Sequence, residues 1–253
     1  ILDLEEQKKS TNILDKKICI IGMGFVGLTL SLVMANNGYL VYGYDKNKST
    51  ISKLKKNKSP FYEKGLDDYL KKLSQKKIFF HNNLNKINPD VYIITVGTPL
   101  LKNGLKPDIS AIKKVSTEIS NKIKKNDLVI LRSTVPVGTT RKIVKNIIEK
   151  RSKLKCGLDF SLSFAPERTV EGDALNEITS LPQIIGSFDK KSLNFSDEIF
   201  SEFTKNIIKV ENIESAEMIK IINNTFRDVK FAYANEIALI SKNLNLDVSE
   251  LIK

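Results

Sequence analysis

The stretch KKICIIGMGFVGLTLSLVMANNGYLVYGYD, residues 16–45, decides the fold. An apolar run at 18–21 is followed by glycines at G-x-G-x-x-G spacing and by a helical pattern at 28–37, which Gly38 ends. A second apolar run then ends on Asp45. This order of strand, glycine turn, helix and strand predicts a βαβ unit.

The glycines have separate tasks in a dinucleotide-binding turn. Gly22 allows the sharp turn, Gly24 lets a diphosphate approach the backbone, and Gly27 lets the helix pack closely on the strand. The helix N-terminus presents unpaired N–H groups to the phosphates. The alternative is a turn in an α/β protein that binds no dinucleotide. The candidate cofactor-binding residues of this segment are Gly22, Gly24, Phe25, Val26, Gly27 and Asp45.

The acid at the end of the second strand predicts the kind of dinucleotide. The carboxylate of Asp45 would accept hydrogen bonds from the ribose hydroxyls and would repel a 2′-phosphate. We therefore expect NAD rather than NADP as the cofactor.

The composition is ordinary for a globular protein apart from a basic charge. Of 253 residues, 41% are hydrophobic, and the net charge is +12. The lysines are spread along the chain without interleaved aromatic residues, so we expect an anionic ligand and no nucleic-acid partner. We find no apolar run that could span a bilayer and no signal-peptide core at the beginning of the chain. These features predict a cytoplasmic protein without a membrane partner.

Cysteine and histidine are too few for a disulfide framework or a metal site. Cys19 lies in the first apolar run, where a buried structural thiol is expected, and Cys156 has the same structural interpretation. The single histidine, His81, is expected in a solvated loop. We therefore predict no metal centre.

Apolar runs and helical patterns alternate along most of the chain. This alternation predicts an α/β fold: a Rossmann-like parallel sheet with helices on both faces. Further strands are expected at 39–45, 78–80, 90–99, 127–138 with its loop, 160–167, 181–187 and 206–210. Helices are expected at 48–57, in the second part of 59–75, at 109–125 after a capping Asp108, at 139–150 and at 192–205.

A long helix is expected at 214–243, because this segment has neither glycine nor proline and its apolar residues recur at helical intervals. The apolar stripe predicts packing on the sheet or on a second subunit, as in a homodimer. Another helix is expected to start at 247 and to stop unfinished at 253. The stripe consists of Ile219, Ile222, Phe226, Val229, Tyr233, Ile237 and Ile240.

These patterns predict three regions. Residues 1–15 form an amino-terminal tail, and residues 16–210 form an NAD-binding Rossmann-like domain. Residues 211–253 hold the long central helix and the truncated start of the next one.

Four motifs follow the glycine turn in a fixed order: VGTP (96–99), STVPVGTT (133–140), APERTVEGDAL (165–175) and AEMIKIINNTFRDVKFAYANEIA (216–238). Together they resemble the UDP-glucose/GDP-mannose dehydrogenase family, over nearly all of 16–253. The resemblance implies two successive NAD-dependent oxidations that turn the C6 alcohol of a nucleotide sugar into a carboxylate. Only the amino-terminal and central portions of the family are recognised.

The resemblance gives roles to two threonines that follow predicted strands. Thr98 is expected to contact the cofactor, and the alternative is an ordinary turn threonine. Thr134 is expected to touch the cofactor and to help hold a water near the reacting carbon. Its alternative role is a helix-capping hydroxyl.

Two acids follow the sixth predicted strand. By similarity to the family, Glu167 takes a proton from the hydrolytic water, provided that its pKa lies near the working pH. Glu171 is carried over as a neighbour of cofactor or substrate. Both are solvated loop acids in the alternative interpretation. Glu167 is also counted with the substrate-binding residues, as is Thr169, which lies between the two acids.

Lys220, Asn224 and Arg227 are spaced i, i+4 and i+7, so they share one helix face. In the family, the matching lysine and asparagine stabilise oxyanions and serve catalysis. The alternative is an exposed polar stripe, although asparagine weakens a helix interior. Lys220 and Asn224 are also expected to bind the substrate.

Arg168 and Arg227 resemble the members that oxidise UDP-N-acetylmannosamine or UDP-N-acetylglucosamine. Guanidinium groups suit sugar or phosphate oxygens, so both residues are predicted to bind the substrate. The alternatives are UDP-glucose or GDP-mannose oxidation, or a non-catalytic NAD-binding and dimerisation module. The family's nucleophilic G-G-x-C segment and its UDP-binding domain are not found, so the chain is predicted to be an inactive fragment.

Overall fold

The computed structural model describes residues 12–251 except 103 and 105. Residues 1–11 of the predicted tail at 1–15 therefore lie outside the described residues. Within the described part of the tail, Ile13–Asp15 form a short 3-10 helix, η1, whose first turn is capped by the Asn12 side chain.

Within the described residues, eight strands form one sheet with the order β3-β2-β1-β4-β5-β6-β7-β8. Because β1 is central and strands are added outward on both sides, the fold is the Rossmann-like α/β fold that the sequence predicts. The strands are β1 (Lys17–Ile21), β2 (Leu40–Tyr44), β3 (Ile78–His81), β4 (Val91–Ile94), β5 (Leu128–Leu131), β6 (Ser161–Phe164), β7 (Gln183–Ser187) and β8 (Ile207–Val210).

One strand pair departs from the predicted parallel sheet: β7 runs antiparallel to β6, although β8 is again parallel to β7. The connection between β6 and β7 contains only the short helix α6 (Ala174–Ser180), which the sequence did not predict. Two parallel strands need a connection that returns the chain to the end of the sheet where the first strand began. The β6–β7 connection does not return there, so β7 starts at the end of the sheet where β6 stops and runs in the opposite direction.

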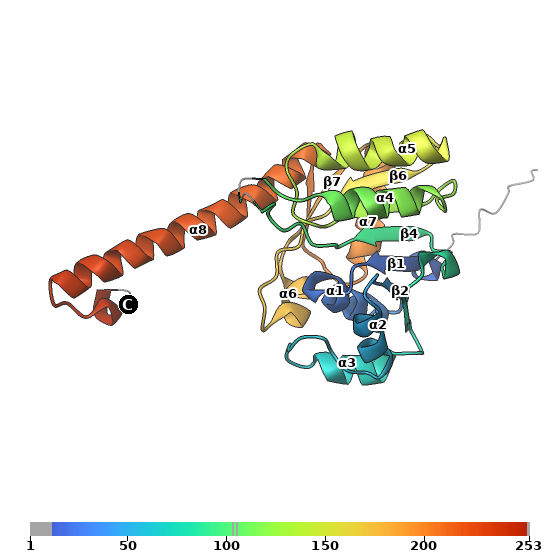
Figure 1. The fold of residues 1–253 in the computed structure, drawn as a ribbon. Coiled ribbons are helices and arrows are strands. Elements are labelled where there is room, and N and C mark those ends of the chain that lie inside the picture. Colours follow the sequence, from blue (N-terminus) through green and yellow to red (C-terminus); the bar gives the residue numbers. More distant parts are fainter. Residues whose placement is uncertain (1–11, 103, 105, 252–253) are drawn as a thin grey trace, which may run out of the picture.

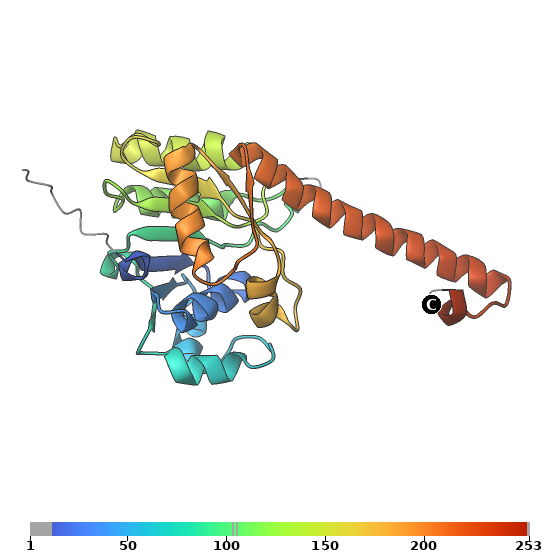
Figure 2. The ribbon, with the colours of Figure 1, turned by 180° about the vertical axis from the view of Figure 1, so that it is seen from behind.

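Helices cover both faces of the sheet, as Figures 1 and 2 show from opposite sides. Residues alternate along β1 between two apolar clusters: Ile20 packs with residues of α1 and α7, and Ile21 with residues of α4 and α5. The helices are α1 (Phe25–Asn36), α2 (Lys48–Lys55), α3 (Leu66–Leu73), η2 (Leu84–Lys86), α4 (Ser110–Ser120), the π-helix η3 (Thr140–Lys145), α5 (Asn146–Ser152), α6, α7 (Lys190–Ser201), α8 (Ile213–Asn243) and α9 (Val248–Leu251).

Three local predictions are corrected. His81 is the last residue of β3 and is half-buried, so the solvated-loop prediction is wrong. Helix α1 begins at Phe25 rather than at residue 28, because Gly24 in extended conformation serves as its N-cap. Helix α4 ends at Ser120, five residues earlier than predicted.

Helix α8 is anchored to the sheet only at its beginning. Ala216 packs against β7 so closely that a Cβ on Gly186 would lie 2.8 Å from the Cβ of Ala216. The rest of the helix projects away from the sheet (Figures 1 and 2). Of the apolar stripe, Ile219 packs against the core, but the part beyond it does not pack on the sheet: Phe226 is 65% exposed and Tyr233 68%.

Among the described residues, we find no helix that is both long and apolar enough to cross a membrane.

Candidate functional site

The glycine turn follows β1 and has the geometry that a diphosphate requires. Gly22 has a φ of +106°, and its N–H donates to the Tyr44 carbonyl at 2.8 Å. A Cβ on Gly27 would lie 1.8 Å from the Gly22 carbonyl oxygen, so α1 packs on the turn only because Gly27 lacks a side chain. Above Gly24, a Cβ would meet nothing within 4 Å. The turn thus leaves open space where a ligand could approach the backbone.

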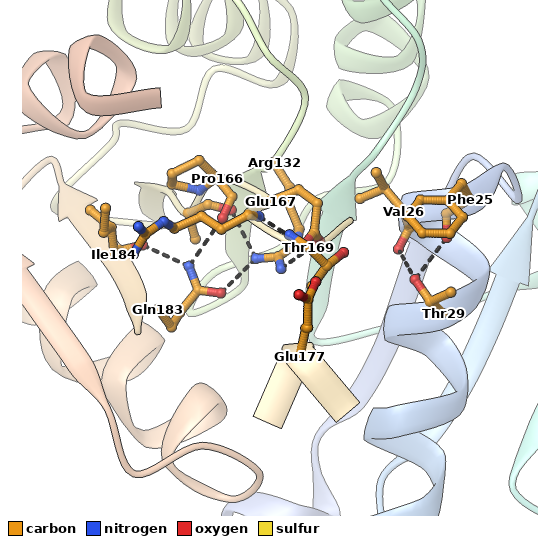
Figure 3. A network of polar contacts seen from close by, with 12 residues as sticks. Phe25, Val26, Thr29, Arg132, Pro166, Glu167, Thr169, Glu177, Gln183 and Ile184 are labelled. Carbon is orange, nitrogen blue, oxygen red and sulfur yellow. Dashed lines mark hydrogen bonds and ion pairs between the residues drawn. The ribbon is translucent and has the colours of Figure 1, made fainter. Parts of the chain in front are cut away.

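The first turn of α1 is available to an anion. Its N-cap, Gly24, provides no side-chain hydrogen bond, so the first N–H groups of α1 have no side-chain cap. Phe25 and Val26 form this turn, both half-buried, and their carbonyls accept hydrogen bonds from the Thr29 hydroxyl (Figure 3). The two residues therefore lie at the turn, as the sequence predicts.

Asp45 is fixed at the end of β2 by two backbone N–H groups. Its Oδ2 accepts from Met23 N and its Oδ1 from Asn47 N, each at 2.8 Å. A carboxylate oxygen has more than one lone pair, so both oxygens can still accept from ribose hydroxyls. The carboxylate faces a cavity of about 420 Å³, whose lining includes Gly22, Gly24, Tyr44, Asp45, Gly97, Asp108, Lys114 and Glu118.

Two residues of the cavity lining, Tyr44 and Glu118, are hydrogen-bonded to each other. The Tyr44 hydroxyl donates to Glu118 Oε2 at 3.1 Å. Burial, together with the negative charge of Glu118, raises the pKa of Tyr44 to about 12, so its hydroxyl keeps its proton at neutral pH. The residues present thus fit a dinucleotide, with the diphosphate on the turn and the adenosine in the cavity.

The two predicted threonines come from neighbouring strand ends. The Thr98 hydroxyl donates to the Thr134 carbonyl at 2.7 Å, which joins the loops after β4 and β5. Thr98 is half-buried and Thr134 is exposed. Both lie at the carboxyl ends of parallel strands, where α/β sheets bind their ligands.

A buried ion pair, which the sequence analysis missed, lies beside this edge. Arg132 is 3% exposed and Glu167 6%. Arg132 donates through Nε and Nη2 to Glu167 Oε2, at 3.1 and 2.7 Å, and through Nη1 to Gln183 Oε1 at 2.7 Å (Figure 3). The only signal in the sequence was a cation at the end of the apolar run of β5, directly before Ser133.

Glu167 is held as an ionised carboxylate. Its Oε1 accepts from the N–H groups of Arg168 and Thr169, both at 2.8 Å. Burial raises the pKa of Glu167, but the Arg132 charge and the hydrogen bond from the Thr169 N–H outweigh it, so the pKa lies below its ordinary value. The condition for a general base, a pKa near the working pH, is therefore not met in this structure.

Lys220 of α8 contacts the same segment. Its Nζ donates to the backbone carbonyl of Glu167. Burial lowers the pKa of Lys220, and the Glu167 charge only partly opposes it. The charges of Arg132, Arg227 and Arg168 lower it further, although Arg132 is itself paired with Glu167.

The remaining predicted residues lie around this region with different exposure. Asn224, one helical turn beyond Lys220, is half-buried, whereas Arg227 is exposed. Arg168 is half-buried and donates through Nη1 to the Pro182 carbonyl at 3.1 Å. Glu171 is exposed.

Glu217, also missed by the sequence analysis, fixes α8 to the loop that follows Thr134. Its carboxylate accepts from the N–H of Gly138, and from the N–H and hydroxyl of Thr140 at 2.8 and 2.6 Å. Burial raises the pKa of Glu217. Because Glu217 lies three residues before Lys220, this contact also determines where Lys220 lies.

Comparison with known proteins accounts for this arrangement. Residues 16–204 match the NAD-binding domain of the UDP-glucose/GDP-mannose dehydrogenase family, and residues 214–253 match its central domain. The chain belongs to this family. Because the match includes the NAD-binding domain, NAD is the cofactor of this domain.

Family members with known structures have the same fold. The UDP-N-acetyl-D-mannosamine dehydrogenase of Pyrococcus horikoshii is 34% identical over 94% of this chain and 56% of its own length. The structure of that enzyme has a TM-score of 0.88, covering 93% of this chain. A ternary complex of GDP-mannose dehydrogenase from Pseudomonas aeruginosa has a TM-score of 0.87 at 33% identity, covering 93% of this chain and 55% of that one.

A UDP-N-acetyl-D-mannosamine dehydrogenase of Campylobacter jejuni is 32% identical over 94% of this chain and 60% of its own length. The chain thus spans little more than half the length of the dehydrogenases that it matches.

Replacing Asp45 with asparagine should weaken NAD binding about ten- to a hundredfold, because a hydrogen bond to a charged group contributes about 1.5–3 kcal/mol. Discrimination against NADP should fall as well, since the repulsion of a 2′-phosphate is lost. Titration calorimetry with both dinucleotides measures the two effects. Asp68→Asn, on the exposed surface of α3, is the control; an unchanged NAD affinity in Asp45→Asn would contradict the assignment.

Proposed function

We propose that the complete protein is an NAD-dependent dehydrogenase that oxidises the C6 alcohol of a UDP-N-acetylhexosamine to a uronate. The observation that carries the proposal is the position of Lys220. It lies against the Glu167 carbonyl, among the charges of Arg168 and Arg227, on a domain that binds NAD. Relatives named UDP-N-acetyl-D-mannosamine dehydrogenases favour this substrate class over UDP-glucose or GDP-mannose.

The basic groups have complementary roles in this proposal. Lys220, whose pKa is lowered by burial, accepts the proton of the C6 hydroxyl and then stabilises oxyanions together with Asn224. Arg168 and Arg227 bind sugar or phosphate oxygens. NAD, when bound, accepts the hydride.

The loop residues complete the proposed site. Thr134 holds a water near the reacting carbon, and Thr98 and Glu171 lie next to the cofactor. The carboxylate of Glu167 holds its own loop by accepting from the N–H of the adjacent Thr169, and its backbone carbonyl holds Lys220.

The test is an assay of the complete protein against a panel of nucleotide sugars, with NADH formation and uronate as the readouts. We expect turnover of UDP-N-acetylmannosamine or UDP-N-acetylglucosamine, with two NADH formed for each uronate. Turnover confined to UDP-glucose or GDP-mannose would overturn the substrate class.

Residues 1–253 alone should bind NAD without forming a uronate. The family's covalent step needs a reactive thiolate, and both cysteines here are buried. Burial raises the pKa of the Cys19 thiol, and burial together with the charge of Glu149 raises that of Cys156 to about 12. Neither is suited to act as the nucleophile. Free thiols are usual in the reducing cytoplasm, where we place the protein.

The exposed stripe of α8 favours a second role, in which the chain acts as an NAD-binding and dimerisation module. We infer that two copies pair through α8, because apolar residues exposed along one helix face need a covering surface. The exposed apolar residues on this face are Met218, Ile222, Phe226, Val229, Tyr233 and Ile240, whereas the exposed Phe231 and Leu239 lie outside it.

A Phe226→Glu/Val229→Glu double variant should change from dimer to monomer, because two charges would be buried in the interface. Light scattering coupled to size-exclusion chromatography measures the mass. Asn235→Glu is the matched control, since residue 235 lies on the opposite side of the helix from 226. A monomeric wild-type protein, or a double variant that remains dimeric, would refute pairing through this face.

A further inference from the structure

A buried carboxylate lies outside the residues discussed so far. Glu63 belongs to the segment 59–65, which precedes α3, and it is only 5% exposed. Acidic side chains are seldom this buried unless they are paired. The partners of Glu63 are backbone N–H groups more than a hundred residues away in the chain.

Gly172 lies in the loop between β6 and α6, and Ala174 is the first residue of α6. Glu63 Oε2 accepts from Gly172 N at 2.8 Å, and Oε1 accepts from Ala174 N at 2.9 Å. Two further acids hold the same loop: Glu167 accepts from Arg168 and Thr169, as described above, and Glu177 Oε2 accepts from Val170 N at 2.6 Å. Glu63 differs from both because it comes from a distant segment of the chain.

The segment 59–65 is in turn attached to the cofactor turn. The ring of Phe61 lies 5.7 Å, centroid to centroid, from the ring of Phe25, which is the first residue of α1. Asp67 Oδ1 accepts from Ser59 N at 3.2 Å and fixes the segment's beginning. One short segment therefore contacts both the turn for the NAD diphosphate and the loop that carries Arg168 and Thr169.

We propose that Glu63 is a positioning residue, which holds the 165–174 loop at a set distance from the dinucleotide turn. The inference rests on the proposed function, because this loop carries the proposed substrate-binding residues. Hydride transfer requires the reacting carbon and the nicotinamide to meet in a narrow range of geometries, and a displacement of about 1 Å can cost a hundredfold in rate. Neither hydrogen bond of Glu63 reaches the glycine turn or Asp45, so of the proposed cofactor-binding residues only Glu171 lies on the loop that Glu63 holds.

The test replaces Glu63 with glutamine in the complete protein. A glutamine amide has one oxygen, so its NH₂ group would face one of the two backbone N–H groups and that hydrogen bond would be lost. We expect kcat/KM for the nucleotide sugar to fall at least tenfold, while the Kd for NAD stays within twofold of wild type. Asp68→Asn is the matched control, because it removes a nearby exposed acid that does not contact the loop.

Amide hydrogen exchange separates positioning from a purely local contact. In Glu63→Gln, residues 168–171 should exchange faster, although Glu63 accepts from none of their amides. Glu63→Asp, which keeps the charge but shortens the side chain, should show an intermediate effect. Thermal unfolding verifies that each variant is folded.

Two results would overturn the proposal: a kcat/KM within twofold of wild type, or a parallel loss of NAD affinity. Amide hydrogen exchange that becomes faster only at Gly172 and Ala174 would also contradict the proposal, because it would show that Glu63 affects only the two amides that it contacts. A wild-type protein that oxidises no nucleotide sugar refutes the proposed function instead, and the exchange and NAD measurements then decide the role of Glu63 independently.

Discussion

Gly27→Ala is expected to reduce NAD affinity by more than a hundredfold and to destabilise the fold. The added methyl group would lie 1.8 Å from the Gly22 carbonyl oxygen and 2.5 Å from Thr95 Oγ1. Because the first of these is backbone, α1 must move away from β1, and overpacking of this kind costs about 1–3 kcal/mol or more. The movement also displaces the N–H groups that face the diphosphate.

The control is Gly24→Ala, which separates packing from ligand approach. A Cβ at this position meets nothing within 4 Å in the structure, so the melting temperature should equal that of wild type. NAD binding should still fall, because the methyl group occupies the space through which the diphosphate reaches the backbone. Calorimetry and thermal unfolding measure both variants.

Gly27→Ala with wild-type stability and wild-type NAD affinity would contradict the close packing of helix and turn. Loss of stability in Gly24→Ala would contradict the open space above that residue. The two variants thus test the turn at two independent positions.

Arg132→Met is expected to lower the free energy of unfolding by about 3–5 kcal/mol, because it leaves the Glu167 carboxylate buried and unpaired. The loss exceeds that for a surface pair, since both side chains are almost fully enclosed. The Ala165 carbonyl and the Gln183 amide oxygen also lose a donor. Arg132→Lys keeps the charge but not the planar fork, so a smaller loss is expected.

The contribution of Glu167 to the free energy of unfolding should change with pH in opposite directions in wild type and in Arg132→Met. In wild type, the folded-state pKa of Glu167 is below 4.5, so its stabilisation is present above that pH and is lost as the pH falls through the folded value. In Arg132→Met, burial is no longer opposed by the guanidinium, and the pKa of Glu167 rises. The destabilisation should therefore be smaller at about pH 5 than at about pH 7.

Urea unfolding at both pH values measures these differences. The double variant Arg132→Met/Glu167→Gln should recover part of the lost stability, because it removes the unpaired charge. An Arg132→Met variant within about 1 kcal/mol of wild type would show that the pair is not what holds this loop.

The sequence determined the features that depend on neighbouring residues. Glycine spacing, an apolar run and a helical period are local, so they predicted the βαβ unit, the cofactor turn and the position of Asp45 at a strand end. Lys220, Asn224 and Arg227 were placed on one helix face for the same reason. The family's motifs extended this to Thr98, Thr134 and the Glu167 loop, which do lie at one edge of the sheet.

Only the tertiary structure decided which distant groups meet. Arg132 and Glu167 are 35 residues apart, and Glu63 and Gly172 are 109 apart. Their contacts follow from the strand order, from the antiparallel direction of β7 and from the packing of α3, and a local sequence pattern encodes none of these. Burial then determined the charge states of Glu167 and Lys220, because the pKa of a side chain depends on the groups around it in space.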